Sequence, residues 1–231
     1  LQYFLRKYCK QRVNFLHFMR ISHLLCGLAL AFNLSGCWAE TLAPHSIPTE
    51  PQTIQASRAD GFVAKQLVAS ARAQIGVTLA YDPAYTAIAY PNGDVAQEKG
   101  VCTDVVIRAM RAQKIDLQVL VHEDMKRAFE KYPTRWGLRR PDASIDHRRV
   151  LNLEVLMQRK GKSIPITHNP SDYRAGDWVT WRVGDDKLPH IGIVSDRQSL
   201  AGTPLIIHNI GRGTQEEDIL FAFPITGHFR W

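Results

Sequence analysis

The fold of this chain is decided by residues 176–194, which read GDWVTWRVGDDKLPHIGIV. Apolar residues alternate with polar or small ones over residues 179–183 and again over residues 190–194. A period of two is typical of strands that bury one face. The stretch therefore predicts two successive strands of a sheet.

The rest of the body separates into helices first and strands afterwards. Apolar residues recur at helical spacing in four upstream segments, with Asp60 as the first N-cap and Gly76 and Gly161 as stops. The predicted helices are residues 60–75, residues 102 onward, 117–131 and 150–160, and further strands are predicted at 205–209, 219–223 and 228–231. This order favours an α+β domain in which N-terminal helices pack on an antiparallel sheet of about five strands.

An export leader is predicted for residues 1–39. A mostly apolar, uncharged run at 21–34 follows Met19-Arg20, which makes Met19 the predicted start, and small residues follow the run. This order is typical of a secretory signal peptide, because the run is shorter than the roughly 20 residues that span a bilayer. We therefore expect an exported, periplasmic protein.

The end of the leader leaves two outcomes open. Leu34-Ser35-Gly36-Cys37 resembles a bacterial lipobox, in which Cys37 would be lipidated and would anchor the protein to a membrane. A cut after Ala39 would instead release an unlipidated protein. Residues 40–57 hold three prolines and are predicted to form a flexible tether, and residues 58–231 are predicted to form one domain.

The net charge of +7 does not indicate nucleic-acid binding. Residues 1–39 carry five basic and no acidic residues, which leaves 24 basic against 22 acidic residues in the remainder. A nucleic-acid binder needs a basic stripe interleaved with aromatic residues, and the body has none. We expect no nucleic-acid partner, and membrane contact only through an anchor at Cys37.

Cys102 is the one cysteine outside the leader. In an exported protein it has no intramolecular disulfide partner, so it is either a buried apolar residue or a reactive thiol. It lies at the start of a predicted helix, where free N–H groups and the helix dipole stabilise a thiolate and can hold an oxyanion. Position alone leaves both interpretations open.

Cys102 and three downstream segments resemble the NlpC-type peptidases, which are papain-like cysteine hydrolases of bacterial cell walls. The segments are Gly176-Asp177-Trp178-Val179, His190-Ile191-Gly192-Ile193 and the strand that ends in His208. The resemblance implies a papain-like fold, with Cys102 as nucleophile, His190 as base and His208 as the residue that orients His190. We expect no cofactor and no metal, and a peptidoglycan or peptide substrate.

A second resemblance covers nearly all of the body. The chain is similar to the family called domain of unknown function 1287, and this similarity implies little about function by itself. It is carried by Tyr81-Asp82-Pro83, Tyr90-Pro91-Asn92-Gly93-Asp94-Val95, Gly100-Val101-Cys102-Thr103-Asp104, Val121-His122-Glu123-Asp124-Met125, Ile145-Asp146-His147-Arg148-Arg149 and Pro189-His190-Ile191-Gly192-Ile193-Val194-Ser195.

The residues around Cys102 depart from the NlpC-type pattern. Those enzymes usually have Asp before the cysteine and Ser-Gly after it, whereas Val101 precedes Cys102 here and Thr103-Asp104 follow. Because these flanking positions help to select the peptide, the usual cleavage specificity does not carry over.

The third catalytic residue has two candidates. Neighbours in a strand point to opposite faces, so only one of His208 and Asn209 can face His190. The NlpC-type resemblance favours His208, and the Cys-His-Asn triads of papain-type enzymes make Asn209 the rival.

These residues predict an exported cysteine hydrolase that cleaves an amide bond, most simply in peptidoglycan peptides. The Cys102 thiolate, paired with protonated His190, would attack the carbonyl, and Tyr81 would assist the backbone N–H groups that hold the oxyanion.

Weaker candidates for substrate binding surround these residues. Arginines bind carboxylates in a forked geometry, which suits an acidic peptide, although a solvated loop explains the 147–149 segment equally well. The candidates are Asp104, His147, Arg148 and Arg149.

Three rival functions stay open. One is a metal site made of Cys102, His147, His190 and His208, although the sequence has no close-spaced ligand pair. A second is a module that binds peptidoglycan or a protein without cutting it. The third is acyl transfer or amide cleavage on another substrate, since papain-like folds host several reactions. The sequence does not predict the oligomeric state.

Overall fold

The structure is a computed structural model that describes residues 63–231. The predicted leader, the lipobox at Cys37, the tether and the predicted N-cap Asp60 lie outside these residues. The described part is α+β and contains α2 (Ala64–Arg72), α3 (Cys102–Arg111), α4 (Leu117–Arg127) and α5 (Val150–Arg159). No helix within residues 63–231 has the length and apolarity that a membrane crossing needs.

The four predicted helices are present, with shorter bounds. The first is helical over Ala64–Arg72 rather than to residue 75. The third ends at Arg127, because Ala128 leaves the helical conformation with φ −150°, and a 3₁₀ turn, η1 (Phe129–Lys131), follows. Asp116 caps α4 by accepting a hydrogen bond from the backbone N–H of Gln118. Two further 3₁₀ turns are η2 (Asp146–Arg148) and η3 (Pro170–Asp172).

Five antiparallel strands form one sheet in the order β6-β5-β4-β3-β7. The strands are β3 (Trp178–Val183), β4 (Leu188–Gln198), β5 (Pro204–Asn209), β6 (Thr214–Glu217) and β7 (Ile225–Phe229). The deciding stretch gives the central pair, in which Trp181 is opposite His190. The predicted fold class and the five-stranded antiparallel sheet are confirmed.

The predicted strand at 219–223 is wrong. These residues form a turn, in which Ala222 N–H donates to the carbonyl of Ile219, and the carbonyl of Leu220 accepts the indole N–H of Trp181. Ile219 and Leu220 are buried in this turn, and this burial explains the apolar pattern that predicted a strand. The fourth strand is instead the polar segment β6, and the last strand begins at Ile225 rather than at residue 228.

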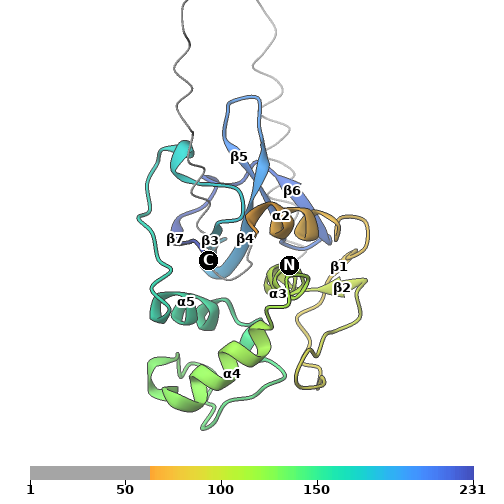
Figure 1. The fold of residues 1–231 in the computed structure, drawn as a ribbon, viewed down its shortest axis with the longest axis vertical. Helices are drawn as coiled ribbons and strands as arrows, with labels where there is room; N and C mark the ends of the chain where they lie inside the picture. Colours follow the sequence, from red (N-terminus) through yellow and green to blue (C-terminus); the bar gives the residue numbers. More distant parts are fainter. Residues whose placement is uncertain (1–62) are drawn as a thin grey trace, which may run out of the picture. The chain divides into compact units, whose positions relative to one another are not determined.

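The core lies between α2, α3, α5 and the sheet. α2 and α3 pack on β4, and α4 packs on α3 and α5 (Figure 1). Trp178, Ile191 and Ile193 on the sheet meet Val106 and Met110 of α3 in one buried cluster. This packing fixes the first turn of α3 against β4.

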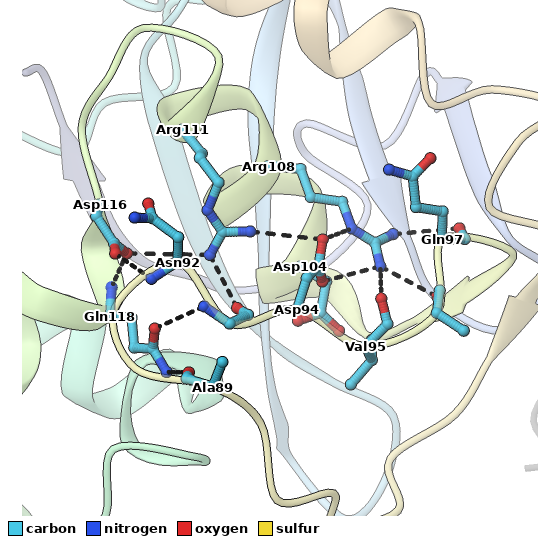
Figure 2. Close-up of polar contacts among 12 residues, drawn as sticks. Ala89, Asn92, Asp94, Val95, Gln97, Asp104, Arg108, Arg111, Asp116 and Gln118 are labelled. Atoms are coloured by element: carbon cyan, nitrogen blue, oxygen red, sulfur yellow. Dashed lines mark hydrogen bonds and ion pairs between the residues drawn. The ribbon is translucent and has the colours of Figure 1, made fainter.

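The irregular segment 82–98 is closed at its base by two short parallel strands, β1 (Ala80–Tyr81) and β2 (Lys99–Gly100). Figure 2 shows how helix side chains hold it. Arg108 of α3 binds both carboxylate oxygens of Asp94 at 2.9 and 3.1 Å and also donates to the carbonyl of Lys99 at 3.1 Å. Gln118 of α4 bonds Gly93 and Ala89. The segment is therefore fixed to the helix that carries Cys102.

Candidate active site

Cys102 is the first residue of α3. The preceding residue, Val101, is extended, and its backbone N–H donates to the Asp104 carboxylate at 2.6 Å. This bond caps the helix start from inside the first turn. Gly100 is required at the approach, because a Cβ there would lie 2.9 Å from the same carboxylate oxygen.

The sulfur of Cys102 is buried against β4, and the residue is 3% exposed. Burial raises the pKa of its thiol to about 12, and the charge of Asp104 acts in the same direction. Hydrogen bonds from the backbone N–H groups of Ile191, Thr103 and Cys102 itself oppose this shift. The sequence predicted a thiolate at Cys102, but the structure favours the protonated thiol. The loss of solvation on burial outweighs the hydrogen bonds that the helix start offers to a thiolate.

Behind this position, His190, His208 and Glu217 form a buried line of hydrogen bonds. Nε2 of His190 lies 2.9 Å from Nδ1 of His208, and Nε2 of His208 lies 3.2 Å from the Glu217 carboxylate. Arg212 donates to the other oxygen of Glu217 at 2.7 Å. The line joins β4, β5 and β6 and ends at the protein surface, since the Arg212 side chain is 58% exposed.

The line fixes the protons of both imidazoles. A carboxylate only accepts, so His208 donates to Glu217 through Nε2. A neutral His208 then accepts from Nε2–H of His190, which leaves Nδ1 of His190 as its basic nitrogen. Burial and the neighbouring His208 hold the pKa of His190 well below its ordinary value, and the bond from His208 lowers the pKa of Glu217 to about 2.

Asn209 points elsewhere. Its Nδ2 donates to the carbonyls of Gly100 at 3.1 Å and Ala80 at 3.3 Å. The structure therefore brings His208, and not Asn209, to His190. The amide of Asn209 instead ties β5 to the two short strands that lead into Cys102.

A cavity of about 380 Å³ opens beside Cys102. Pro189, which precedes His190, lies in its wall. The other lining residues come from the loops and helix starts around it, and they are Tyr81, Pro83, Tyr85, Val101, Trp136, Ile145, Arg148, Arg149, Val150 and Leu151. The volume falls in the usual range for small-ligand sites.

Tyr81 lies in the cavity wall close to Cys102. Its pKa is raised by burial first, and by the charges of Cys102 and Asp104 next. Tyr81 therefore keeps its O–H proton and can donate a hydrogen bond into the cavity.

The weaker sequence candidates divide into two groups. Arg148 and Arg149 line the cavity, whereas Asp104 and His147 do not. Both oxygens of Asp104 are occupied, since Arg148 Nε and Nη2 each donate to them at 2.9 Å. His147 is 2% exposed, and burial lowers its pKa to about 4. Asp104 and His147 thus support the wall rather than face a ligand.

The metal alternative has no ligand cluster within residues 63–231. No group of three or more His, Cys, Asp or Glu side chains there is arranged to hold an ion. His208 is already bonded on both ring nitrogens.

Glu217 is the residue that sequence reasoning missed. The segment Thr214-Gln215-Glu216-Glu217 is polar and resembles a loop, and the neighbouring apolar run at 219–223 resembles a strand. A signal was present, because two acidic residues just after a strand that ends in histidine are available to pair with it.

Comparisons with known proteins place the chain in a family. A family model described as "Domain of unknown function (DUF1287)" matches residues 68–231. The "Uncharacterized protein YijF" of Escherichia coli (strain K12) is 56% identical over 208 residues, which are 88% of this chain and 97% of that protein. NlpC1 from Trichomonas vaginalis is a solved structure with 12% identity and a TM-score of 0.41, and the match covers 73% of this chain and 44% of that one. The chain therefore spans less than half of the NlpC1 chain. From the match over residues 68–231 and the close relative, the chain belongs to the DUF1287 family.

Proposed function

We propose that this protein is an exported cysteine hydrolase that cleaves an amide bond in peptidoglycan peptides. One observation carries the proposal: the sulfur of Cys102, at a helix start in a cavity wall, accepts a hydrogen bond from the backbone N–H of Ile191, and the preceding residue, His190, begins a buried line of hydrogen bonds to His208 and Glu217. Nucleophile, base and orienting group are the parts that such a reaction needs.

In the proposed first step, Nδ1 of His190 takes the proton of the neutral Cys102 thiol as the sulfur attacks the amide carbonyl. The carbonyl electrons move onto oxygen, and backbone N–H groups at the start of α3 and the Tyr81 hydroxyl hold the resulting oxyanion. Proton transfer during attack fits a site in which burial disfavours both the thiolate and the imidazolium.

In the second half, protonated His190 gives its proton to the amine as the carbon–nitrogen bond breaks, which leaves a thioester on Cys102. His190 then removes a proton from water as the oxygen attacks the thioester carbon; the carbon–sulfur bond breaks, the carboxylic acid leaves, and His190 returns the proton to the sulfur. His208 and Glu217 act as positioning residues, because they hold the His190 ring and offset the charge that it gains.

The substrate class is supported by the chain's resemblance to cell-wall peptidases and by its predicted export leader. The cavity holds a short peptide better than a folded protein surface, given its volume.

The test is to incubate the full chain, as wild type and as Cys102→Ala, with purified peptidoglycan and its soluble fragments, and to identify products by mass spectrometry. New products from the wild type alone, whose masses name the bond, would support the proposal. Products from Cys102→Ala as well would contradict the nucleophile. Tight binding of the peptides to both proteins without products from either would favour the binding module instead.

A further inference from the structure

The cavity beside Cys102 carries positive charge without an acidic residue in its wall. Among the described residues that line it, Arg148 and Arg149 are charged and none is Asp or Glu. Tyr81 adds a hydroxyl group, whereas the hydroxyl of Tyr85 donates to Asp142 at 3.3 Å. A peptide that enters therefore meets hydrogen-bond donors and cationic groups.

The charge of Arg148 is mostly neutralised by a buried ion pair with Asp104. Asp104 takes its Nε and Nη2 in a forked pair, and the two side chains are each 3% exposed. The remaining nitrogen, Nη1, is buried and has no hydrogen-bond partner. Leaving a buried donor of a charged group without an acceptor costs free energy. A ligand in the cavity could supply the acceptor that Nη1 lacks.

Arg149 is less compensated. Its Nη1 donates to the buried Asp146 at 2.9 Å, and its guanidinium carbon lies 4.1 Å from the ring centre of Trp136. Asp142 also lies near enough to raise its pKa, but within residues 63–231 Nε and Nη2 make no hydrogen bond. Burial nevertheless lowers the pKa of Arg149, which indicates that its charge lacks full solvation. Asp146 and Trp136 thus hold the guanidinium in place. Among the described residues, none accepts a hydrogen bond from its Nε or Nη2.

We propose that this unused edge of Arg149 binds a carboxylate of the peptide that Cys102 cleaves, so that the substrate is an acidic peptide with a carboxylate near the scissile bond. The inference rests on the proposed function. A guanidinium fork binds a carboxylate through two parallel charge-assisted hydrogen bonds, and a neutral amide cannot replace that partner equally well.

The first test uses Cys102 as a reporter and needs no peptide. Iodoacetate and iodoacetamide are similar in size and alkylate the same sulfur, but only iodoacetate carries a carboxylate. We expect the rate ratio of iodoacetate to iodoacetamide to fall about tenfold in Arg149→Gln, because a charged cleft concentrates ions of opposite sign. The matched control is Arg140→Gln, which removes the same charge from an exposed position of the preceding loop that does not line the cavity.

The second test measures peptide binding to the full chain with Cys102→Ala, so that no cleavage occurs. The probes are an acidic peptidoglycan stem peptide and the same peptide with its carboxylates amidated. Adding Arg149→Gln is expected to weaken binding of the acidic peptide about tenfold and to leave binding of the amidated peptide unchanged.

The two arms separate this inference from the proposed function. If Cys102 reacts with neither reagent because its thiol is buried, peptide binding alone decides the carboxylate site, and the cleavage assay with Cys102→Ala decides the nucleophile. An unchanged reagent ratio and an unchanged preference for the acidic peptide overturn the carboxylate site. If Arg149→Gln fails to fold because Asp146 loses its partner, Arg149→Lys keeps that pair but lacks the fork, and an unchanged preference there overturns the inference as well.

Discussion

At the scale of single residues, the hydrogen bonds that His190 and His208 make determine what His190 can do in the proposed reaction. Each ring nitrogen of His208 has a partner, and Glu217 is held from its far side by Arg212. The arrangement leaves one nitrogen of His190 to exchange a proton with a neighbour. In the proposed reaction, the basicity of His190 therefore depends on the Glu217 carboxylate, to which it is linked through His208.

Glu217→Gln is expected to lower turnover by at least about tenfold and to move the acid limb of the kcat/KM profile to lower pH. The negative charge of Glu217, which reaches His190 through His208, favours the protonated form of His190, so its removal lowers the pKa of the base. The measurement is a pH–rate profile of the purified variant.

The control is the adjacent Glu216→Gln. Glu216 pairs with Arg72 at 2.8 Å and with Ser195, not with His208. Its loss is expected to lower the melting temperature but not to shift the profile. A shift of equal size in both variants would mean that general surface charge, rather than the hydrogen bond to His208, sets the pKa of the base.

At the scale of elements, Gly192 sets the distance between β4 and β5. A Cβ at this position would lie 2.4 Å from Cγ2 of Ile206 and 3.2 Å from Cβ of His208. Only glycine lets the two strands approach closely enough for His190 to reach His208.

Gly192→Ala is expected to destabilise the protein by about 1–3 kcal/mol and to reduce activity, because β5 must move away from β4. The double variant Gly192→Ala/Ile206→Ala removes the clashing methyl group and should lose less stability than the two single variants together. Denaturant unfolding of the four proteins measures the coupling. Strict additivity would contradict the clash.

The element scale also shows what the sequence could predict. Periodicity predicted the helices and the central strands correctly, because their apolar residues face one continuous core. It failed at β6, whose side chains serve hydrogen bonds rather than the core: Glu216 binds Arg72, and Glu217 binds His208. Partners distant in the chain decide such a strand, and no local pattern reveals them.

In the candidate site, too, the sequence predicted some features, and contacts between distant parts of the chain decided others. Cys102 was singled out by its place at a helix start, and the resemblance to the NlpC-type peptidases implied the roles of Cys102, His190 and His208. The choice between His208 and Asn209 required the faces of β5 in space. The roles of Asp104 and Arg148 were hidden for a similar reason. Their forked ion pair joins residues 44 positions apart.

At the scale of the whole molecule, folding buries neutral histidines. His147 is 2% exposed, and its pKa in the folded protein is about 4 against an ordinary value of 6.5. The unfolded chain therefore takes up this proton below pH 6.5, while the folded protein resists until about pH 4. The stabilising effect is complete above pH 6.5 and is lost as the pH falls to 4.

Between pH 7 and pH 4, the free energy of unfolding of the wild type is expected to fall by up to about 3 kcal/mol more than that of His147→Gln. Urea unfolding of both proteins at several pH values measures this difference. The comparison isolates His147 from His190, whose pKa is lowered in both proteins. Parallel pH curves for the two proteins would show that His147 is not buried in its neutral form.

The covered, neutral thiol of Cys102 has a consequence for the lifetime of the protein. Oxidation by peroxide and exchange with small disulfides proceed through the thiolate, and burial raises the pKa of this thiol to about 12, so little thiolate forms at neutral pH. A cysteine held in this way stays reduced for longer than an exposed cysteine does when oxidants are present.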